Sequence, residues 1–343
     1  MALGFGIIGC GTIANWHVAG IRACKDAVLI GAADFKPEFS EKFCAKYGIK
    51  QFMSVEEMLA SPEIDVVCIC TPSGLHAGYA IQVANAGKHV VCEKPMALTV
   101  EDCDKVIEAV EKNNVKCCVI SQSRFTKTTQ TIKAALDEGK LGRVVTGDVS
   151  MKYYRSPEYY LAGGWRGTWK MDGGGALMNQ GIHGIDALQY LMGNVKSVYG
   201  YARTLARNIE VEDTCSAVLE FENGAIGIIQ GTTSVYPGYP RRLSISGTKG
   251  TITINEEIFE HYDIEGEDTL PEGVVIGGDQ RSGAADPTNM DTEGHEIQIA
   301  DTVDAILNNR EPKVNARDGK RPVQIITAIY KSSQTGEKVE LDM

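Results

Sequence analysis

The sequence predicts an α/β protein with two domains. The first carries a doubly wound parallel sheet, and the second is an α+β domain with a large, mostly antiparallel open sheet. Three observations support this prediction. The chain has 343 residues, which exceeds most single domains. Short apolar runs alternate with amphipathic segments over about the first 120 residues. After Arg124 the pattern changes to strands with period-two alternation.

The first domain is predicted from continuous apolar strands joined by helices, a pattern typical of a parallel sheet covered on both faces. The strand patterns are residues 4–11, 27–34, 66–72, 89–95 and 116–122. The helical patterns between them include Glu38–Tyr47, His76–Ala86 and Val100–Asn113. We place this domain at residues 1–123.

The second domain, residues 124–343, is predicted from a helix at Thr128–Glu138 followed by alternating strands. The strand patterns are residues 143–153, 196–204, 214–234 and 241–254. Turns at Asn223-Gly224 and Gly247–Gly250 indicate antiparallel hairpins. Glu265–Thr292 is weakly patterned and predicts a long loop. His295–Asn308 and Pro322–Ser333 predict two closing helices, which we expect to pack either on the second domain or back on the first.

Composition excludes several classes of partner. The formal charge of −11 (34 basic and 45 acidic residues) argues against a nucleic-acid or anionic-membrane surface. No run of about 18 apolar residues predicts a membrane span. The ten cysteines sit mostly in apolar runs and form no CxxC pair, which favours buried thiols in a reducing cytoplasm and no metal site.

A glycine-rich turn follows the first strand and reads G-x-G-x-x-A, from Gly9 and Gly11 through Thr12 and Ile13 to Ala14. The glycines allow a tight turn and close approach of a pyrophosphate to the helix N-terminus. An acidic residue, Asp34, ends the second strand at the spacing expected for a ribose-binding carboxylate. The pattern predicts a Rossmann domain that binds NAD in preference to NADP, although the nearby basic residue Lys36 weakens that preference.

The segment GGGALMNQGIHGID, Gly173 to Asp186, places an amide and an imidazole one helical turn apart. Asn179 and His183 would share one helix face. Taken alone, this segment fits either a catalytic face or a polar stripe beside a core histidine.

Together these motifs resemble the Gfo/Idh/MocA oxidoreductase family, named for glucose–fructose oxidoreductase, inositol dehydrogenase and a rhizopine-catabolism protein. The matching pieces are the N-terminal glycine turn, Thr71-Pro72 after a strand, His76, Glu93-Lys94-Pro95, the GGGALMNQGIHGID segment and the final helix DGKRPVQIITAIYKSSQTGEKVEL. The resemblance implies a cofactor at the carboxyl ends of the first domain's strands. It also implies that the second sheet forms a subunit interface in a homodimer or homotetramer.

The resemblance implies roles for individual residues. Lys94 would lie between the nicotinamide and the substrate hydroxyl, and His183 would be the general base. The implied cofactor contacts are Gly9, Gly11, Thr12, Ile13, Asp34, Thr71, Pro72, Ser73, His76, Glu93, Lys94, Gln122, Trp165 and Arg166. The implied substrate contacts are Lys94, Tyr154, Arg155, Trp165, Asn179 and His183.

Asn179 departs from the family pattern, which often has an aspartate at this position. An asparagine cannot raise the basicity of His183 by its charge, but it can hydrogen-bond a sugar hydroxyl or orient the ring. Either Lys94 carries more of the proton transfer, or Asn179 recognises substrate while His183 acts alone.

The leading functional hypothesis is an NAD-dependent dehydrogenase that oxidises a secondary hydroxyl of a sugar, sugar derivative or cyclitol. The first alternative is a redox-neutral glycosidase or lyase that uses tightly held NAD and a transient keto-sugar. The second is a non-catalytic sensor that binds NAD or sugar.

Overall fold

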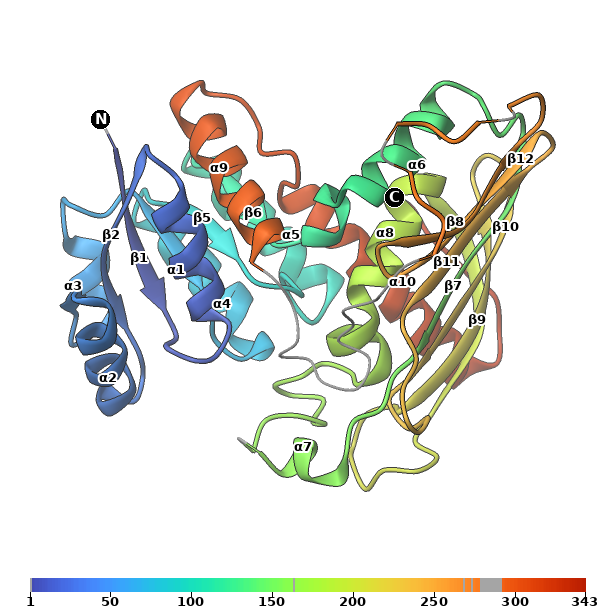
Figure 1. Cartoon of the computed structure of the whole chain (residues 1–343). Helices are drawn as coiled ribbons and strands as arrows, with labels where there is room; N and C mark the ends of the chain where they lie inside the picture. The colour runs from blue at the N-terminus through green and yellow to red at the C-terminus, as the bar shows by residue number, and fades with distance from the viewer. Residues whose placement is uncertain (1, 163, 268, 273, 278–291) are drawn as a thin grey trace. The chain divides into compact units, whose positions relative to one another are not determined.

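The computed structural model describes residues 2–162, 164–267, 269–272, 274–277 and 292–343 (Figure 1). The chain forms two compact units. Unit 1 contains Met1–Gln122 and Asp291–Lys320, and unit 2 contains Ser123–Met290 and Arg321–Met343. The long helix α10, Ala316–Thr335, contains the third and last boundary between them along the chain. Most of the predicted loop Glu265–Thr292 lies outside the described residues.

Unit 1 is built on a six-stranded parallel sheet with the order β3-β2-β1-β4-β5-β6. Its strands are β1 Leu3–Ile8, β2 Ala27–Ala33, β3 Lys50–Gln51, β4 Val66–Ile69, β5 His89–Cys92 and β6 Cys117–Val119. Its helices are α1 Ala14–Ala23, α2 Pro37–Tyr47, α3 Val55–Ala60, α4 His76–Asn85, α5 Val100–Lys112 and α9 Glu293–Leu307, with the 3₁₀ turns η1 Ser73–Leu75 and η2 Gln122–Phe125 starting after β4 and β6. The strand order reverses after β1, which is where ligands bind in doubly wound sheets.

The central strands of unit 1 are buried on both faces, as the apolar runs predict. All four residues of β4 are fully buried. One core cluster combines strand residues with apolar side chains of α1, α2 and α9. A Cβ at Gly20 of α1 would lie 3.0 Å from the side chain of Ile299, so α1 and α9 pack closely. Helix α9 therefore belongs to the core of unit 1 although it comes late in the chain.

Unit 2 is built on an eight-stranded sheet with the order β13-β12-β11-β7-β10-β9-β8-β14. Neighbouring strands are antiparallel except for β7 and β10, which pair in parallel. The strands are β7 Val144–Lys152, β8 Val195–Arg203, β9 Thr214–Phe221, β10 Ile226–Thr232, β11 Arg242–Gly247, β12 Gly250–Asn255, β13 Ile258–Ile264 and β14 Val339–Glu340. The other elements are α6 Lys127–Asp137, α7 Pro157–Leu161, the π-helix η3 Ala176–Gly181 and α8 Ile182–Met192.

The strands of unit 2 alternate between a buried and an exposed face. In β9, Cys215, Ala217 and Leu219 are buried while Val218 is 51% exposed. Helix α8 packs on β7 over the buried face, where a Cβ at Gly184 would lie 3.1 Å from Val149. The predicted fold class, a parallel Rossmann sheet plus a mostly antiparallel open sheet, is confirmed. Among the described residues, no helix is both long and apolar enough to cross a membrane.

Candidate active site

The predicted nucleotide turn connects β1 to α1 and has room above its backbone. Gly9 has a φ of +92°, and a Cβ there would lie 2.7 Å from the carbonyl oxygen of Cys70. Only glycine fits this position without strain. A Cβ at Gly11 would meet nothing within 4 Å, so the backbone at Gly11 faces open space. Ala14 is fully buried where α1 packs on the sheet. These features fit a pyrophosphate beside the start of α1.

Asp34 lies beside this turn because β1 and β2 are neighbours with Ile8 opposite Ala33. Its carboxylate accepts the backbone N–H of Cys10 at 2.7 Å and that of Lys36 at 2.9 Å. These bonds fix the carboxylate and leave further lone pairs for ribose hydroxyls. The Lys36 ammonium lies 5.5 Å from the ring centroid of Phe35. The residues of unit 1 therefore fit the adenosine half of a dinucleotide.

His76 ties together two turns at the carboxyl ends of the strands. Its Nδ1 lies 2.7 Å from the carbonyl oxygen of Pro95, and its Nε2 lies 2.8 Å from that of Thr71. Burial lowers the pKa of His76, and the two carbonyl acceptors offset part of that effect. Pro72 precedes the turn η1, whose first residue Ser73 is buried. His76 thus connects the backbone at Thr71 to the backbone at Pro95, the residue that directly follows Lys94.

Lys94 follows β5 and is the one partly exposed residue between Val90 and Ala97, a stretch in which every other residue is buried. The preceding Glu93 is 4% exposed, and its Oε2 accepts the backbone N–H of Lys94 at 3.3 Å. Gln122 begins η2 after β6 and packs on Gly294 of α9, where a Cβ would lie 2.6 Å from the Cβ of Gln122. The lysine is therefore the polar group that the end of β5 presents outside the core.

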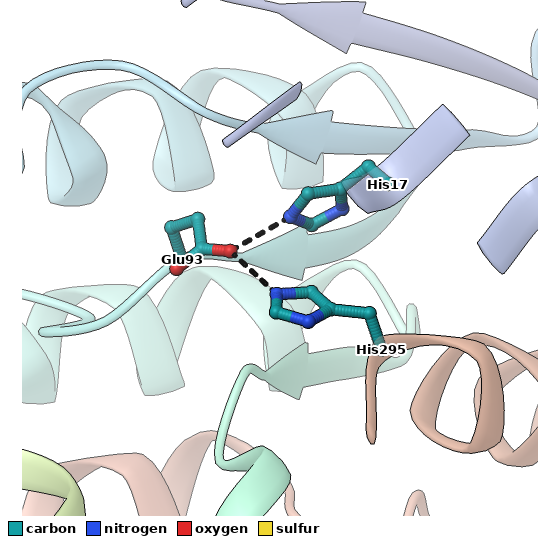
Figure 2. Close-up of side chains that lie close together, drawn as sticks. All are labelled: His17, Glu93 and His295. Atoms are coloured by element: carbon teal, nitrogen blue, oxygen red, sulfur yellow. Dashed lines mark hydrogen bonds and ion pairs between the residues drawn. The ribbon is translucent and has the colours of Figure 1, made fainter. Parts of the chain in front are cut away.

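Glu93 is held by two histidines from distant parts of the chain (Figure 2). Its Oε1 lies 2.8 Å from Nε2 of His17 on α1 and 3.3 Å from Nε2 of His295 on α9. Burial alone raises the pKa of Glu93, but the hydrogen bonds from the two imidazoles outweigh it and hold the pKa well below its usual range. Burial lowers the pKa of His17. The cluster is thus a buried carboxylate held by two imidazoles.

The same three side chains place their ligand atoms within 4.8 Å of one another, close enough to hold a metal ion. Metal binding at both Nε2 atoms would move each imidazole proton to Nδ1. The buried Nδ1 of His17 has no hydrogen-bond partner among the described residues, so a proton there would be unsatisfied. Hydrogen bonding to Glu93 places the proton on Nε2 instead and leaves Nδ1 of His17 as an unpaired acceptor, which is more common in protein interiors than an unpaired N–H donor. The arrangement therefore favours a hydrogen-bonded carboxylate over a metal centre.

In unit 2 the glycines of GGGALMNQGIHGID allow close packing before the π-helix η3. A Cβ at Gly174 would lie 2.1 Å from the hydroxyl oxygen of Tyr330, and one at Gly175 would lie 2.1 Å from the carbonyl oxygen of Glu212. Asn179 lies in this π-helix, and His183 lies in the first turn of α8. The spacing predicts one regular α-helix through Asn179 and His183, but the structure has a π-helix followed by an α-helix.

A buried carboxylate that the sequence analysis missed holds the start of η3. Glu212 accepts the backbone N–H of Gly175 at 2.9 Å and that of Leu177 at 2.8 Å, and the hydroxyl of Tyr330 donates to it at 2.8 Å. Burial raises the pKa of Glu212 to about 7, and the three donors offset part of the rise. No local pattern identifies Glu212, because it precedes β9 and lies more than 30 residues from η3.

Asn179, Gln180 and His183 are the partly exposed residues in the otherwise buried stretch from Asp172 to Gln189. The amide of Asn179 donates to the carboxylate of Asp172. The other oxygen of Asp172 accepts the backbone N–H of Gly167 at 2.8 Å. Gln180 donates to Oδ1 of Asn179 at 3.1 Å. Polar groups exposed on a buried helix are a common feature of ligand sites.

Four further predicted residues belong to this network or to the loop beside it. Arg155 donates from Nε to Oε1 of Gln180 at 3.0 Å. The Arg166 guanidinium lies 4.5 Å from the ring centroid of Tyr159 and 5.2 Å from that of Trp165. Tyr154 meets Tyr236 edge to face with centroids 5.4 Å apart. Unit 2 therefore brings Asn179 and Arg155 into one network, and it stacks Arg166 on Trp165.

Asp186, three residues beyond His183, forms a buried ion pair with Arg124. Nε of Arg124 donates to Oδ2 at 2.8 Å and Nη2 donates to Oδ1 at 2.6 Å. Both carboxylate oxygens are thus engaged by one guanidinium in the bidentate geometry that arginine favours.

The two predicted catalytic residues belong to different units. Lys94 belongs to unit 1 and His183 to unit 2.

A glycine turn on a parallel sheet, with an acidic residue after the neighbouring strand and a second sheet-forming unit, is the arrangement typical of nucleotide-dependent α/β oxidoreductases. The chain belongs to the Gfo/Idh/MocA family. Residues 3–121 match the family's oxidoreductase domain with an NAD-binding Rossmann fold, and residues 129–253 match its C-terminal domain. The predicted family is therefore confirmed, and the chain is an oxidoreductase of this family.

Several characterised proteins resemble the chain over its whole length. The myo-inositol 2-dehydrogenase of Thermotoga maritima is 25% identical, with 98% of each chain covered. The WlbA dehydrogenase of Bordetella pertussis, solved in complex with NADH and UDP-GlcNAcA, is 35% identical with a TM-score of 0.90, covering 100% of this chain and 98% of that chain. Levoglucosan dehydrogenase, solved with NADH and levoglucosan, is 25% identical with a TM-score of 0.88 and full coverage of both chains.

Proposed function

We propose that the protein is an NAD-dependent dehydrogenase that oxidises a secondary hydroxyl of a sugar derivative, and that its substrate is a nucleotide-linked sugar acid of the UDP-GlcNAcA type. The observation that carries the reaction type is the exposure of Lys94 and His183 from otherwise buried segments. The end-to-end similarity to WlbA, at 35% identity, supports the narrower substrate class.

In the proposed reaction, a residue of the protein takes the proton of the substrate hydroxyl. When bound, NAD accepts a hydride from the carbinol carbon. The Lys94 ammonium stabilises the negative charge that develops on the hydroxyl oxygen, and a ring nitrogen of His183 takes the proton. Asn179 and Arg155 contact substrate hydroxyls, and Trp165 offers an aromatic face to the sugar.

Asp34 supports NAD over NADP in this proposal. A 2′-phosphate would bring negative charge to a carboxylate that two backbone N–H groups already hold in place. We expect Asp34→Ala to reduce the preference for NAD by raising the KM for NAD about tenfold or more, with a smaller effect for NADP. The cytoplasmic location inferred from the sequence remains a prediction.

A homo-oligomer formed through the sheet of unit 2 is the second part of the proposal. Five apolar or aromatic side chains on the paired strands β8, β9 and β10 are between 38% and 57% exposed: Tyr199, Tyr201, Val218, Ile226 and Ile228. A contiguous apolar face of this kind is characteristic of an interface. A second copy of the chain is the occupant we propose, in a homodimer or homotetramer.

A substrate panel tests the proposal. Purified protein is mixed with NAD and with UDP-GlcNAcA, UDP-GlcNAc, free hexoses or inositols, and NADH formation is followed. We expect NADH to form fastest with UDP-GlcNAcA. Product formation without added NAD would instead support the redox-neutral alternative. Failure to bind either nicotinamide cofactor would refute the dehydrogenase, and Lys94→Ala with unchanged turnover would support the sensor.

A further inference from the structure

Arg207 lies on the loop that follows β8 in unit 2, and the sequence analysis assigned it no role. Its guanidinium carbon lies 5.2 Å from the ring centroid of Tyr154, one of the predicted substrate contacts. Tyr154 is itself braced by Tyr236. Stacking on an aromatic face fixes the plane of a guanidinium and leaves its edges available for hydrogen bonding.

The backbone at Arg207 is firmly anchored. The buried carboxylate of Asp213 accepts the N–H groups of Leu205 at 3.0 Å, Ala206 at 2.7 Å and Arg207 at 2.7 Å. Burial alone raises the pKa of Asp213, but these bonds outweigh it and lower the pKa. The loop is tied to its neighbour as well, because the N–H of Glu210 donates to the carbonyl oxygen of Gly167 at 2.9 Å. Arg207 therefore lies on a loop whose backbone is held in place by hydrogen bonds.

Two N–H donors on one edge of the Arg207 guanidinium have no acceptor among the described residues. Nε and Nη2 of Arg207 are both buried, and neither has a hydrogen-bond acceptor in the part of the chain that the structure describes. The Asp213 carboxylate bonds to the backbone N–H of Arg207. Glu158 is fully exposed and senses the positive charge of Arg207, but the two form no hydrogen bond among the described residues. Buried donors without acceptors are costly and call for an explanation.

In Arg124, the same guanidinium edge is occupied, and its partner shows which acceptor fits the edge. Arg124 uses Nε and Nη2 to hold the two oxygens of Asp186, at 2.8 Å and 2.6 Å. An oxyanion with two oxygens, a carboxylate or a phosphate, matches this pair of parallel donors. Arg207 offers that pair of donors beside Tyr154 with no such partner in the described chain.

We propose that Arg207 is a specificity-determining residue that binds an oxyanion of the substrate, either a sugar carboxylate or a phosphate of a nucleotide sugar, through its Nε–Nη2 edge. The inference rests on the proposed function and deepens it, because it selects anionic over neutral sugars. A neutral sugar would leave the edge unsatisfied, whereas an anionic substrate would complete it.

Binding measured by calorimetry at saturating NADH tests this assignment. The probes are UDP-GlcNAcA, which carries both anions, UDP-GlcNAc, which lacks the carboxylate, GlcNAcA, which lacks the phosphates, and neutral GlcNAc. We expect Arg207→Gln to weaken binding of the probes that carry the recognised anion about 10- to 100-fold while NADH binding stays unchanged. Arg207→Lys keeps the charge without the paired donors, and we expect it to restore only part of the affinity.

Arg203 provides a matched control. It lies four residues earlier and its guanidinium stacks on Tyr201 at 5.6 Å, but its Nη1 donates to the carbonyl oxygen of Ala202 at 2.8 Å and also to Ser333. We expect Arg203→Gln to leave the affinity for every probe unchanged. Far-ultraviolet circular dichroism and the melting temperature report whether each variant is folded.

The pattern of losses identifies the anion. A loss confined to UDP-GlcNAcA and GlcNAcA assigns the carboxylate, and a loss shared by UDP-GlcNAcA and UDP-GlcNAc assigns the phosphate. Equal affinity of wild type and Arg207→Gln for all anionic probes would overturn the inference, as would an equal loss for neutral GlcNAc. A wild-type protein that oxidises neutral sugars and binds no anionic probe would overturn it while leaving the dehydrogenase intact. Absence of NADH binding and of all turnover would instead refute the proposed function.

Discussion

The side-chain amide of Asn179 donates a hydrogen bond to the carboxylate of Asp172, seven residues earlier in the chain. Asp172 is 1% exposed, and the backbone N–H of Gly167 binds its second oxygen. The family pattern leads us to expect an aspartate where this chain has Asn179. Here a neighbouring carboxylate, Asp172, accepts a hydrogen bond from the Asn179 amide, and Asn179 and His183 are both partly exposed.

Asn179→Asp should destabilise the protein in a pH-dependent way. The substitution places two carboxylates within hydrogen-bond distance, and like charges that close raise the pKa of one of them. Stability is then present at low pH, where the pair shares a proton, and is lost as the pH rises. We expect a loss of about 1–3 kcal/mol at pH 8 and a smaller loss at pH 5, measured by urea unfolding.

The double variant Asp172→Asn with Asn179→Asp is the matched control, because it exchanges the amide and the carboxylate. We expect it to recover most of the stability and to change the pH profile of turnover, since the charge then lies one turn from His183. Asn179→Asp with wild-type stability at both pH values would show that the two side chains do not interact in solution.

Glu212 should make the protein less stable as the pH rises. Its folded-state pKa is raised to about 7 by burial, above the usual value of about 4.3 for a free glutamate. The folded state therefore holds the proton more tightly, so stability falls as the pH rises from about 4.5 through 7. The change is about 4 kcal/mol at most.

Glu212→Gln removes this titration and keeps one oxygen that can accept the backbone N–H of Leu177, while its NH2 group replaces the oxygen that accepts the N–H of Gly175. We expect thermal unfolding of the variant to depend less on pH between 5 and 8 than unfolding of the wild type. Tyr330→Phe removes one donor to Glu212 and should raise the pKa further, which extends the pH dependence upward. Parallel curves for the wild type and Glu212→Gln would contradict the assignment.

The His17–Glu93–His295 cluster should behave as a hydrogen-bonded carboxylate. His17→Ala leaves the buried charge of Glu93 with fewer donors, so we expect it to cost about 2–4 kcal/mol of unfolding free energy. Adding Zn²⁺ should not raise the melting temperature of the wild type, and purified protein should contain less than one equivalent of metal. One equivalent of tightly bound metal that is lost in Glu93→Gln would identify a metal centre instead.

Charge on the open sheet face should dissociate the proposed oligomer. Val218 and Ile228 are neighbours across β9 and β10 and are both about half exposed. Val218→Glu with Ile228→Glu places two desolvated charges in any interface there, so we expect a monomer by sedimentation velocity. Glu41→Lys, at an exposed position of α2 in unit 1, is the charge-change control and should keep the wild-type mass. A wild-type protein that is already monomeric would refute the proposal.

The local parts of the site follow from the sequence because each depends on neighbouring residues. Gly9 and Gly11 come directly after an apolar strand, and Asp34 ends the next strand, so parallel pairing brings them together. Lys94 follows a buried strand in the same way. Alternation in β9 and β10 likewise predicts which side chains face outward.

The supporting parts of the site could not be predicted because they depend on packing between distant segments. His295 reaches Glu93 from 202 residues away, since α9 returns to unit 1. Glu212 contacts η3 from just before β9, and nothing in the sequence distinguishes it from other carboxylates that precede a strand. The π-helix also escapes sequence patterns, because its spacing differs little from that of an α-helix over six residues.

Formation of NADH from NAD and UDP-GlcNAcA, compared between the wild type and Lys94→Met, tests the central claim most directly. Methionine keeps an unbranched side chain that is one atom shorter, and it removes the ammonium that stabilises the developing alkoxide. The account predicts steady NADH formation by the wild type, and a kcat at least 100-fold lower in a folded Lys94→Met variant that still binds NADH. Equal turnover by the two proteins would contradict it.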